Sequence, residues 1–127
     1  ICSMQIIMGF IYQTLLDMGY KPVWNKTETG ISFRFNMELA ICRIDPETLV
    51  VTFMVPNVFP VENSECEPYI RKVNGRYHIG RLANIDGTSV AAISAFFADG
   101  YDSVSLRTRA VVKDLASLIH DFFESMY

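Results

Sequence analysis

The chain has 127 residues, of which 50% are hydrophobic and 13% are aromatic. This length is typical of one domain, and this composition excludes a disordered tail or linker. The formal net charge of −3, with acidic and basic residues interspersed, provides no positive field for nucleic-acid phosphates and argues against a nucleic-acid partner. We therefore expect a single domain over residues 1–127 with a substantial core.

Cysteine usage and hydropathy indicate the cellular compartment in which the protein is expected. Three cysteines, Cys2, Cys42 and Cys66, are an odd number without CxxC spacing, which is typical of thiols in a reducing environment. The apolar residues 1–10 lack the basic segment and cleavage site of a signal peptide. No apolar run reaches the roughly 18 to 20 residues of a membrane helix. The sequence therefore predicts a cytoplasmic protein that does not bind a membrane.

The first predicted element is a helix over residues 4–18. Its apolar residues recur at steps of three and four, which places them on one helical stripe: Met4, Ile7, Met8, Ile11, Leu15 and Met18. Gly19 supplies a left-handed stop. Residues 20–30 are polar and rich in turn formers, so they are predicted to be irregular.

Three strands are predicted next, as an antiparallel meander. Residues 31–38 alternate strictly between apolar and polar, which indicates a strand with one buried and one solvent-exposed face. Residues 39–44 follow after a tight reversal near Met37. Asp45 and Pro46 favour a turn, and the unbroken apolar run of residues 49–55 predicts a third, more buried strand.

Prolines complicate the middle of the chain. Pro56, Pro60 and Pro68 argue against regular structure over much of residues 56–68. A short helix over residues 66–73 that ends at Asn74 and Gly75 is favoured, although Asn-Gly is also a hairpin turn.

The last part of the chain predicts a hairpin and a long helix. Residues 76–85 and 88–97 are apolar-rich and are joined by Asp86-Gly87, a dipeptide suited to a type I′ turn. Helical spacing continues over residues 103–126. The fold class is therefore α+β, with a single antiparallel sheet of about five strands flanked by helices in the order α-β-β-β-α-β-β-α.

The motifs of catalysis and cofactor binding are not found. The two histidines, His78 and His120, have no second metal-type ligand at a suitable spacing. The sequence contains no GxSxG motif and no glycine-rich phosphate loop. We expect no catalytic residue, no metal and no cofactor.

Some apolar residues do not fit the predicted core. Adjacent Phe96 and Phe97 on one strand must point to opposite faces, and residues 58–61 are apolar within a predicted loop. Such residues either form a small hydrophobic cluster beside the main core or contact a partner. The candidate partner contacts are Phe59, Val61, Tyr69 and Phe97.

The element order resembles the YbjN-like family of putative bacterial sensory transduction regulators, which has a type III secretion chaperone-like fold. The resemblance rests on GISFRFNMELAICRIDPETLVVTFMVP at residues 30–56, on YIRKVNGRYHIGRL at residues 69–82 and on the amphipathic last helix. It implies an antiparallel sheet flanked by helices, and a protein that acts by binding. It assigns no functional residue.

Two functions are therefore weighed. The first is a non-enzymatic protein-binding domain, chaperone-like or regulatory, that binds a protein or peptide segment, or a second copy as a homodimer, through apolar surface or by strand addition at a sheet edge. The alternative is a small enzyme or small-molecule-binding domain whose pocket is assembled from scattered residues such as Cys66, His78 and Asp99.

Overall fold

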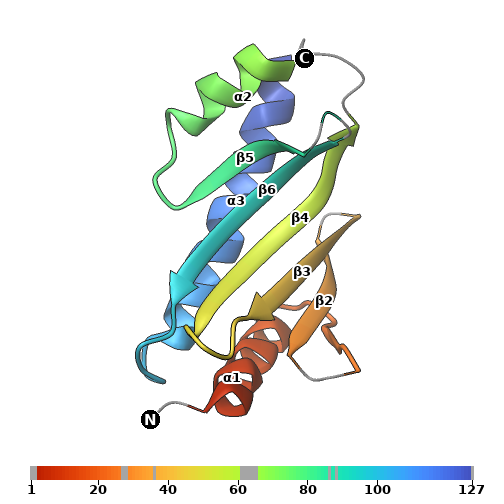
Figure 1. Cartoon of the computed structure of the whole chain (residues 1–127). Coiled ribbons are helices and arrows are strands. Elements are labelled where there is room, and N and C mark those ends of the chain that lie inside the picture. Colours follow the sequence, from red (N-terminus) through yellow and green to blue (C-terminus); the bar gives the residue numbers. More distant parts are fainter. Residues whose placement is uncertain are drawn as a thin grey trace.

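A computed structural model describes residues 3–26, 29–35, 37–60, 66–85, 87 and 89–126. Within these residues the chain is α+β, with one open antiparallel sheet in the order β1-β2-β3-β4-β6-β5 (Figure 1). The helices are α1 (Met4–Asp17), α2 (Glu67–Asn74) and α3 (Val104–Met126). The strands are β1 (Val23–Trp24), β2 (Gly30–Phe35), β3 (Glu38–Ile44), β4 (Val50–Pro60), β5 (Gly80–Ile85) and β6 (Ser89–Phe97).

The predicted fold class is confirmed, with one more strand than the expected five or so. Gly19 adopts a φ of +95° just after α1, as a left-handed stop requires. The extra strand, β1, lies in the segment predicted to be irregular and pairs with β2 through only Val23 and Trp24. A strand of two residues carries too little alternation to be recognised in a sequence.

The prediction that the prolines prevent regular structure directly after residue 55 is wrong. Strand β4 continues to Pro60. Paired residues between β3 and β4 end at Met54, so Pro56 interrupts no ladder with β3, and the register against β6 shifts between Val55 and Phe59. Proline is tolerated at such irregular positions because no N–H is required there.

Helices cover one face of the sheet. Helix α3 crosses behind the strands in Figure 1, α1 packs against α3, and α2 contacts both α3 and β5. The core lies between this face and the helices. Its largest fully buried side chains are Phe35, Phe53, Phe122, Ile7, Met8, Ile11, Leu15, Ile31, Leu118, Val51, Val55 and Val73.

Candidate binding surface

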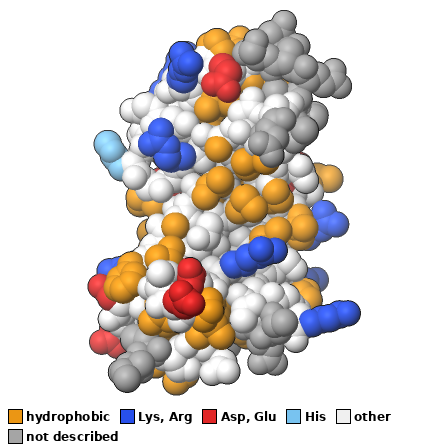
Figure 2. Space-filling model, viewed as in Figure 1, with side chains coloured by type: hydrophobic (Ala, Val, Ile, Leu, Met, Phe, Trp, Pro, Cys, Tyr) orange, Lys and Arg blue, Asp and Glu red, His pale blue; other side chains and the backbone are white. Residues whose placement is uncertain are grey.

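The opposite face of the sheet has no described helix over it (Figure 1). Because side chains alternate along a strand, the residues between the core positions of β2 to β6 point to this side. We call it the open face. Figure 2 views the molecule from this side and shows hydrophobic side chains over the middle of the sheet, with Lys and Arg side chains to either side.

Two neighbouring strands supply most of this apolar surface. Met54 of β4 is paired with Ile93 of β6 on one side and with Ile41 of β3 on the other. The same alternation brings Val50 opposite Phe97 at one end. We call the outward residues of these two strands the central track: Val50, Thr52, Met54 and Pro56 of β4, with Ala91, Ile93, Ala95 and Phe97 of β6.

The central track is largely apolar, and among the described residues all of it except the buried Ala91 is at least partly exposed. Phe97 is 54% exposed. Ala95 is exposed, and Met54 and Ile93 are half-buried because their neighbours on the sheet shield them. A contiguous apolar strip that remains in contact with water is characteristic of an interaction site.

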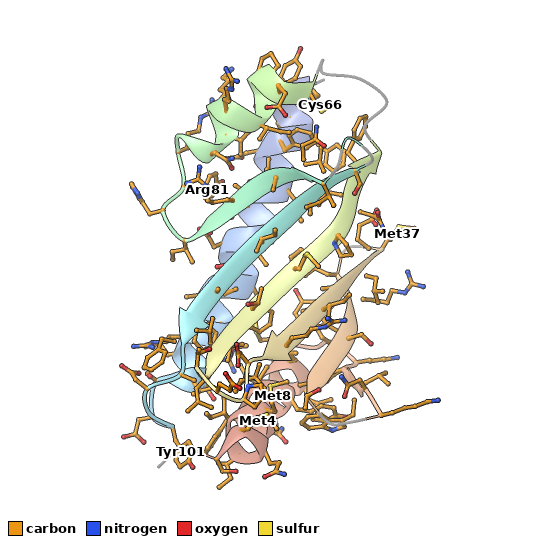
Figure 3. All side chains as sticks on the ribbon, in the orientation of Figure 1. Met4, Met8, Met37, Cys66, Arg81 and Tyr101 are labelled. Carbon is orange, nitrogen blue, oxygen red and sulfur yellow. The ribbon has the colours of Figure 1, made fainter. Side chains whose placement is uncertain are left out.

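Arginines border the central track on both sides. Arg43 of β3 is paired with Thr52, and Arg81 of β5 is paired with Ile93. Figure 3 shows Arg81 beside β5. Both arginines are exposed, and neither makes an ion pair among the described residues. The described outward positions of β2 to β6 carry these two arginines and Arg34, and no acidic residue.

Hollows lie beside the two arginines. One of about 410 Å³ is lined by Ile79, Arg81, Ile93 and Ala95. On the β3 side, a hollow of about 190 Å³ and another of about 640 Å³ both include Arg43, and the larger one also includes Asp45. A guanidinium beside an apolar hollow can hold a carboxylate while the hollow takes up an apolar side chain.

The edge formed by β5 is blocked. The side chain of Asn74 accepts from the backbone N–H of Leu82 at 2.7 Å and donates to the carbonyl of Leu82 at 2.9 Å. The N–H of Gly80 donates to Asp114 Oδ2 at 2.7 Å. A side chain on Gly80 would meet that oxygen, because an added Cβ would lie 2.9 Å from it. These groups occupy the hydrogen-bonding positions that an added strand would need.

The predicted partner contacts lie in different parts of the molecule. Of the four, Phe97 lies on the open face, and Tyr69 lies on α2 with 36% exposure. Phe59 is half-buried and packs against α3, with its ring centroid 6.1 Å from that of Phe122 and 6.2 Å from that of Phe123. Val61 lies outside the described residues. The structure therefore gathers no single patch from this set.

The residues proposed for a scattered catalytic pocket do not meet either. Cys66 is buried at the start of α2, His78 is exposed between α2 and β5, and Asp99 follows β6 at the other end of the sheet (Figures 1 and 3). Asp99 forms an ion pair of 3.2 Å with Arg107. Burial raises the pKa of the other described thiol, Cys42, which disfavours its nucleophilic thiolate.

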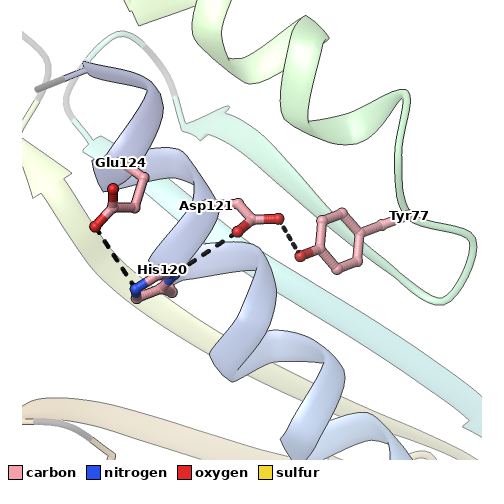
Figure 4. Close-up of polar contacts among 4 residues, drawn as sticks. All are labelled: Tyr77, His120, Asp121 and Glu124. Atoms are coloured by element: carbon pink, nitrogen blue, oxygen red, sulfur yellow. Dashed lines mark hydrogen bonds and ion pairs between the residues drawn. The ribbon is translucent and has the colours of Figure 1, made fainter.

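A separate polar cluster ties the α2–β5 connection to α3 (Figure 4). Tyr77 donates to Asp121 Oδ2 at 2.5 Å, and His120 lies 3.7 Å from both Asp121 and Glu124. Burial, together with this hydrogen bond, raises the pKa of Tyr77 to about 12, whereas the bond holds the pKa of Asp121 below its ordinary value. A phenol held protonated and a carboxylate held ionised act here as a tether.

The sequence interpretation missed three members of this surface: Ile41, Met54 and Ile93. Met54 lies in an apolar run that was predicted to be a more buried strand, and Ile41 and Ile93 lie in predicted strands for which no outward side was assigned. A run with few polar residues gives no indication of which side is exposed to solvent. The available signal was register: once β3, β4 and β6 are paired, Ile41, Met54 and Ile93 fall in one row on the outward side.

Comparison with protein-family models, with curated proteins and with solved structures finds no match for this chain. Among the described residues, no group of three His, Cys, Asp or Glu side chains is placed to hold a metal ion. None of the helices in the described part of the chain has the length and hydropathy needed to cross a bilayer.

Proposed function

We propose that the chain is a non-enzymatic protein-binding domain and that the open face is its binding surface. The observation that carries this proposal is the central track, an apolar strip on two central strands that no described helix covers. Burying such a strip against a partner would stabilise the complex by roughly 25 cal/mol per Å² of apolar area removed from water. A cytoplasmic location is part of the proposal and is supported by Cys42 and Cys66, which are free thiols.

A chaperone-like or regulatory role, as the resemblance to the YbjN-like family implies, is compatible with such a surface. In that case the chain binds a segment of another protein. Binding buries apolar side chains at the centre of the surface and places charged residues around them.

The test compares three purified versions of the chain as baits in an extract of the source cells. Ile93→Glu places a charge in the middle of the central track, and Leu106→Glu places the same charge on α3, where Leu106 is 71% exposed. We expect a protein that the wild type and Leu106→Glu retain and Ile93→Glu loses. Calorimetry with that protein in pure form must then reproduce the loss as at least a tenfold weaker Kd, about 1.4 kcal/mol.

Equal binding of every retained protein to wild type and Ile93→Glu would contradict the proposal. A small molecule that binds stoichiometrically to both variants would favour the alternative, a ligand-binding domain. Thermal unfolding of all three versions shows whether the substitutions leave the fold intact.

A further inference from the structure

The chemistry of the open face defines its occupant. Resting on the proposed function, we infer that the central track binds an amphipathic α-helix of a partner protein, with acidic residues on both flanks of the helix's apolar stripe. The argument has three steps, which concern the partner's backbone, its size and its charge.

The backbone of the partner must satisfy its own hydrogen bonds. An extended segment lying on an apolar sheet face would bury unpaired N–H and C=O groups, each of which costs free energy. It would instead need a sheet edge. At the β5 edge the positions are occupied by Asn74 and Asp114. At the other edge β1 pairs with only two residues of β2, and β3 lies between that edge and the central track. A helix pairs its backbone internally and can therefore lie on the open face.

The dimensions of the central track suit one helix. Its outward residues on β4 run from Val50 to Pro56, which spans about 20 Å at the usual rise of a strand, or about 13 residues of helix. Arg43 on β3 and Arg81 on β5 are separated by three strand spacings, or about 14 Å. A helix about 10 Å across therefore fits between them.

The charge of the face selects acidic flanks. Arg43 and Arg81 lie on opposite sides of the central track, and neither forms an ion pair with a described carboxylate, although Asp45, directly after β3, lines the larger hollow beside Arg43. A helix with glutamates on both flanks would supply one. A second copy of this chain would not, because two open faces placed together would oppose arginine to arginine. The formal charge of −3 also disfavours an anionic lipid surface.

The test uses three synthetic peptides of about 14 residues that share one apolar stripe. The first has glutamate flanks, the second has lysine flanks, and the third is the glutamate peptide with a central proline that breaks the helix. Fluorescence anisotropy measures their binding to the wild type and to the double variant Arg43→Glu/Arg81→Glu. The control double variant, Lys72→Glu/Lys113→Glu, makes the same change in net charge at exposed positions of α2 and α3.

We expect the glutamate peptide to bind at least tenfold more tightly than either other peptide. Arg43→Glu/Arg81→Glu should lose that preference, the lysine double variant should keep it, and added salt should weaken it. Ile93→Glu and, as a second variant at the exposed end of the track, Phe97→Ser should both bind the glutamate peptide less tightly.

Several outcomes would overturn this inference. They are absence of glutamate-peptide binding at about 1 mM, equal binding of the proline peptide, and equal effects of the two double variants. Light scattering that shows a dimer dispersed by Ile93→Glu would assign the face to a second copy. Sedimentation with phosphatidylglycerol vesicles that Ile93→Glu abolishes would assign it to a membrane. If the peptides fail while a protein is still captured through Ile93, the inference falls and the proposed function stands.

Discussion

Met37 and Leu49 are the non-glycine residues of the described chain that adopt positive φ, at 72° and 58°. This region is strained for a side chain with a Cβ, at about 1 kcal/mol. The two residues differ in what their side chains contribute. Met37, in the turn between β2 and β3, is 89% exposed (Figure 3), whereas Leu49 packs against the core.

Met37→Gly should therefore raise the free energy of unfolding, by roughly 0.5 kcal/mol once the greater entropy of glycine in the unfolded chain is included. Leu49→Gly should lower it by about 1 kcal/mol, because the relief of strain is outweighed by the lost burial. Urea unfolding of both variants measures these two changes in the free energy of unfolding. A lower stability for Met37→Gly would show that the turn is not strained.

The hydrogen bond from Tyr77 to Asp121 predicts a pH dependence. The lowered pKa of Asp121 contributes stability above the unfolded-state value of about 4, and this is lost as the pH falls through the folded-state value. The raised pKa of Tyr77 contributes stability below about pH 10, and this is lost as the pH rises through about 12.

The difference in unfolding free energy between wild type and Tyr77→Phe should therefore be greatest between about pH 5 and 9, and of the order of 0.5 to 1 kcal/mol. Urea unfolding at a series of pH values measures it. The tether would be disproved by a difference that stays constant down to pH 2.

Among the elements, β5 has part of its outer edge capped by a single residue of α2. The amide of Asn74 makes two hydrogen bonds to the backbone of Leu82, so Asn74→Ala leaves an N–H and a carbonyl without these partners. We expect a loss of about 1 to 3 kcal/mol in urea unfolding, together with concentration-dependent association through the exposed edge in light scattering.

Lys72→Ala is the matched control on the same helix, since Lys72 is exposed, and should change stability by less than about 0.5 kcal/mol. An Asn74→Ala variant as stable and as monodisperse as this control would argue that water replaces the amide and that the edge is guarded by other groups.

Periodicity predicted the elements where a sequence alternates or repeats clearly. Helices α1 and α3 and strand β2 were placed within a few residues, because each has one buried and one solvent-exposed side, whereas β6 was placed by its apolar composition and the Asp86-Gly87 dipeptide before it. The pairing of β4 with β6 could not be predicted, because no local pattern specifies which strands become neighbours. Phe97 was identified from its neighbour Phe96, but Met54 was not, because its run is apolar on both sides.

At the scale of the whole molecule, the sheet is covered on one side only. The outward side chains of the central track are apolar except for Thr52, and the described helices lie on the opposite side of the sheet (Figure 1). A partner helix on the open face would complete a layer that the described chain leaves out, so that stability of the fold and binding of the partner are served by opposite faces of the same strands.

The sheet order also has a consequence for how the chain reaches this structure. Strands β1 to β4 are neighbours in sequence and in space, as are β5 and β6, so both groups close through short connections. The pairing of β4 with β6 is different, because it joins Val50 to Phe97 and encloses α2 and β5 within one long loop. The loop-closure entropy of the fold is therefore concentrated at the same two strands that form the central track.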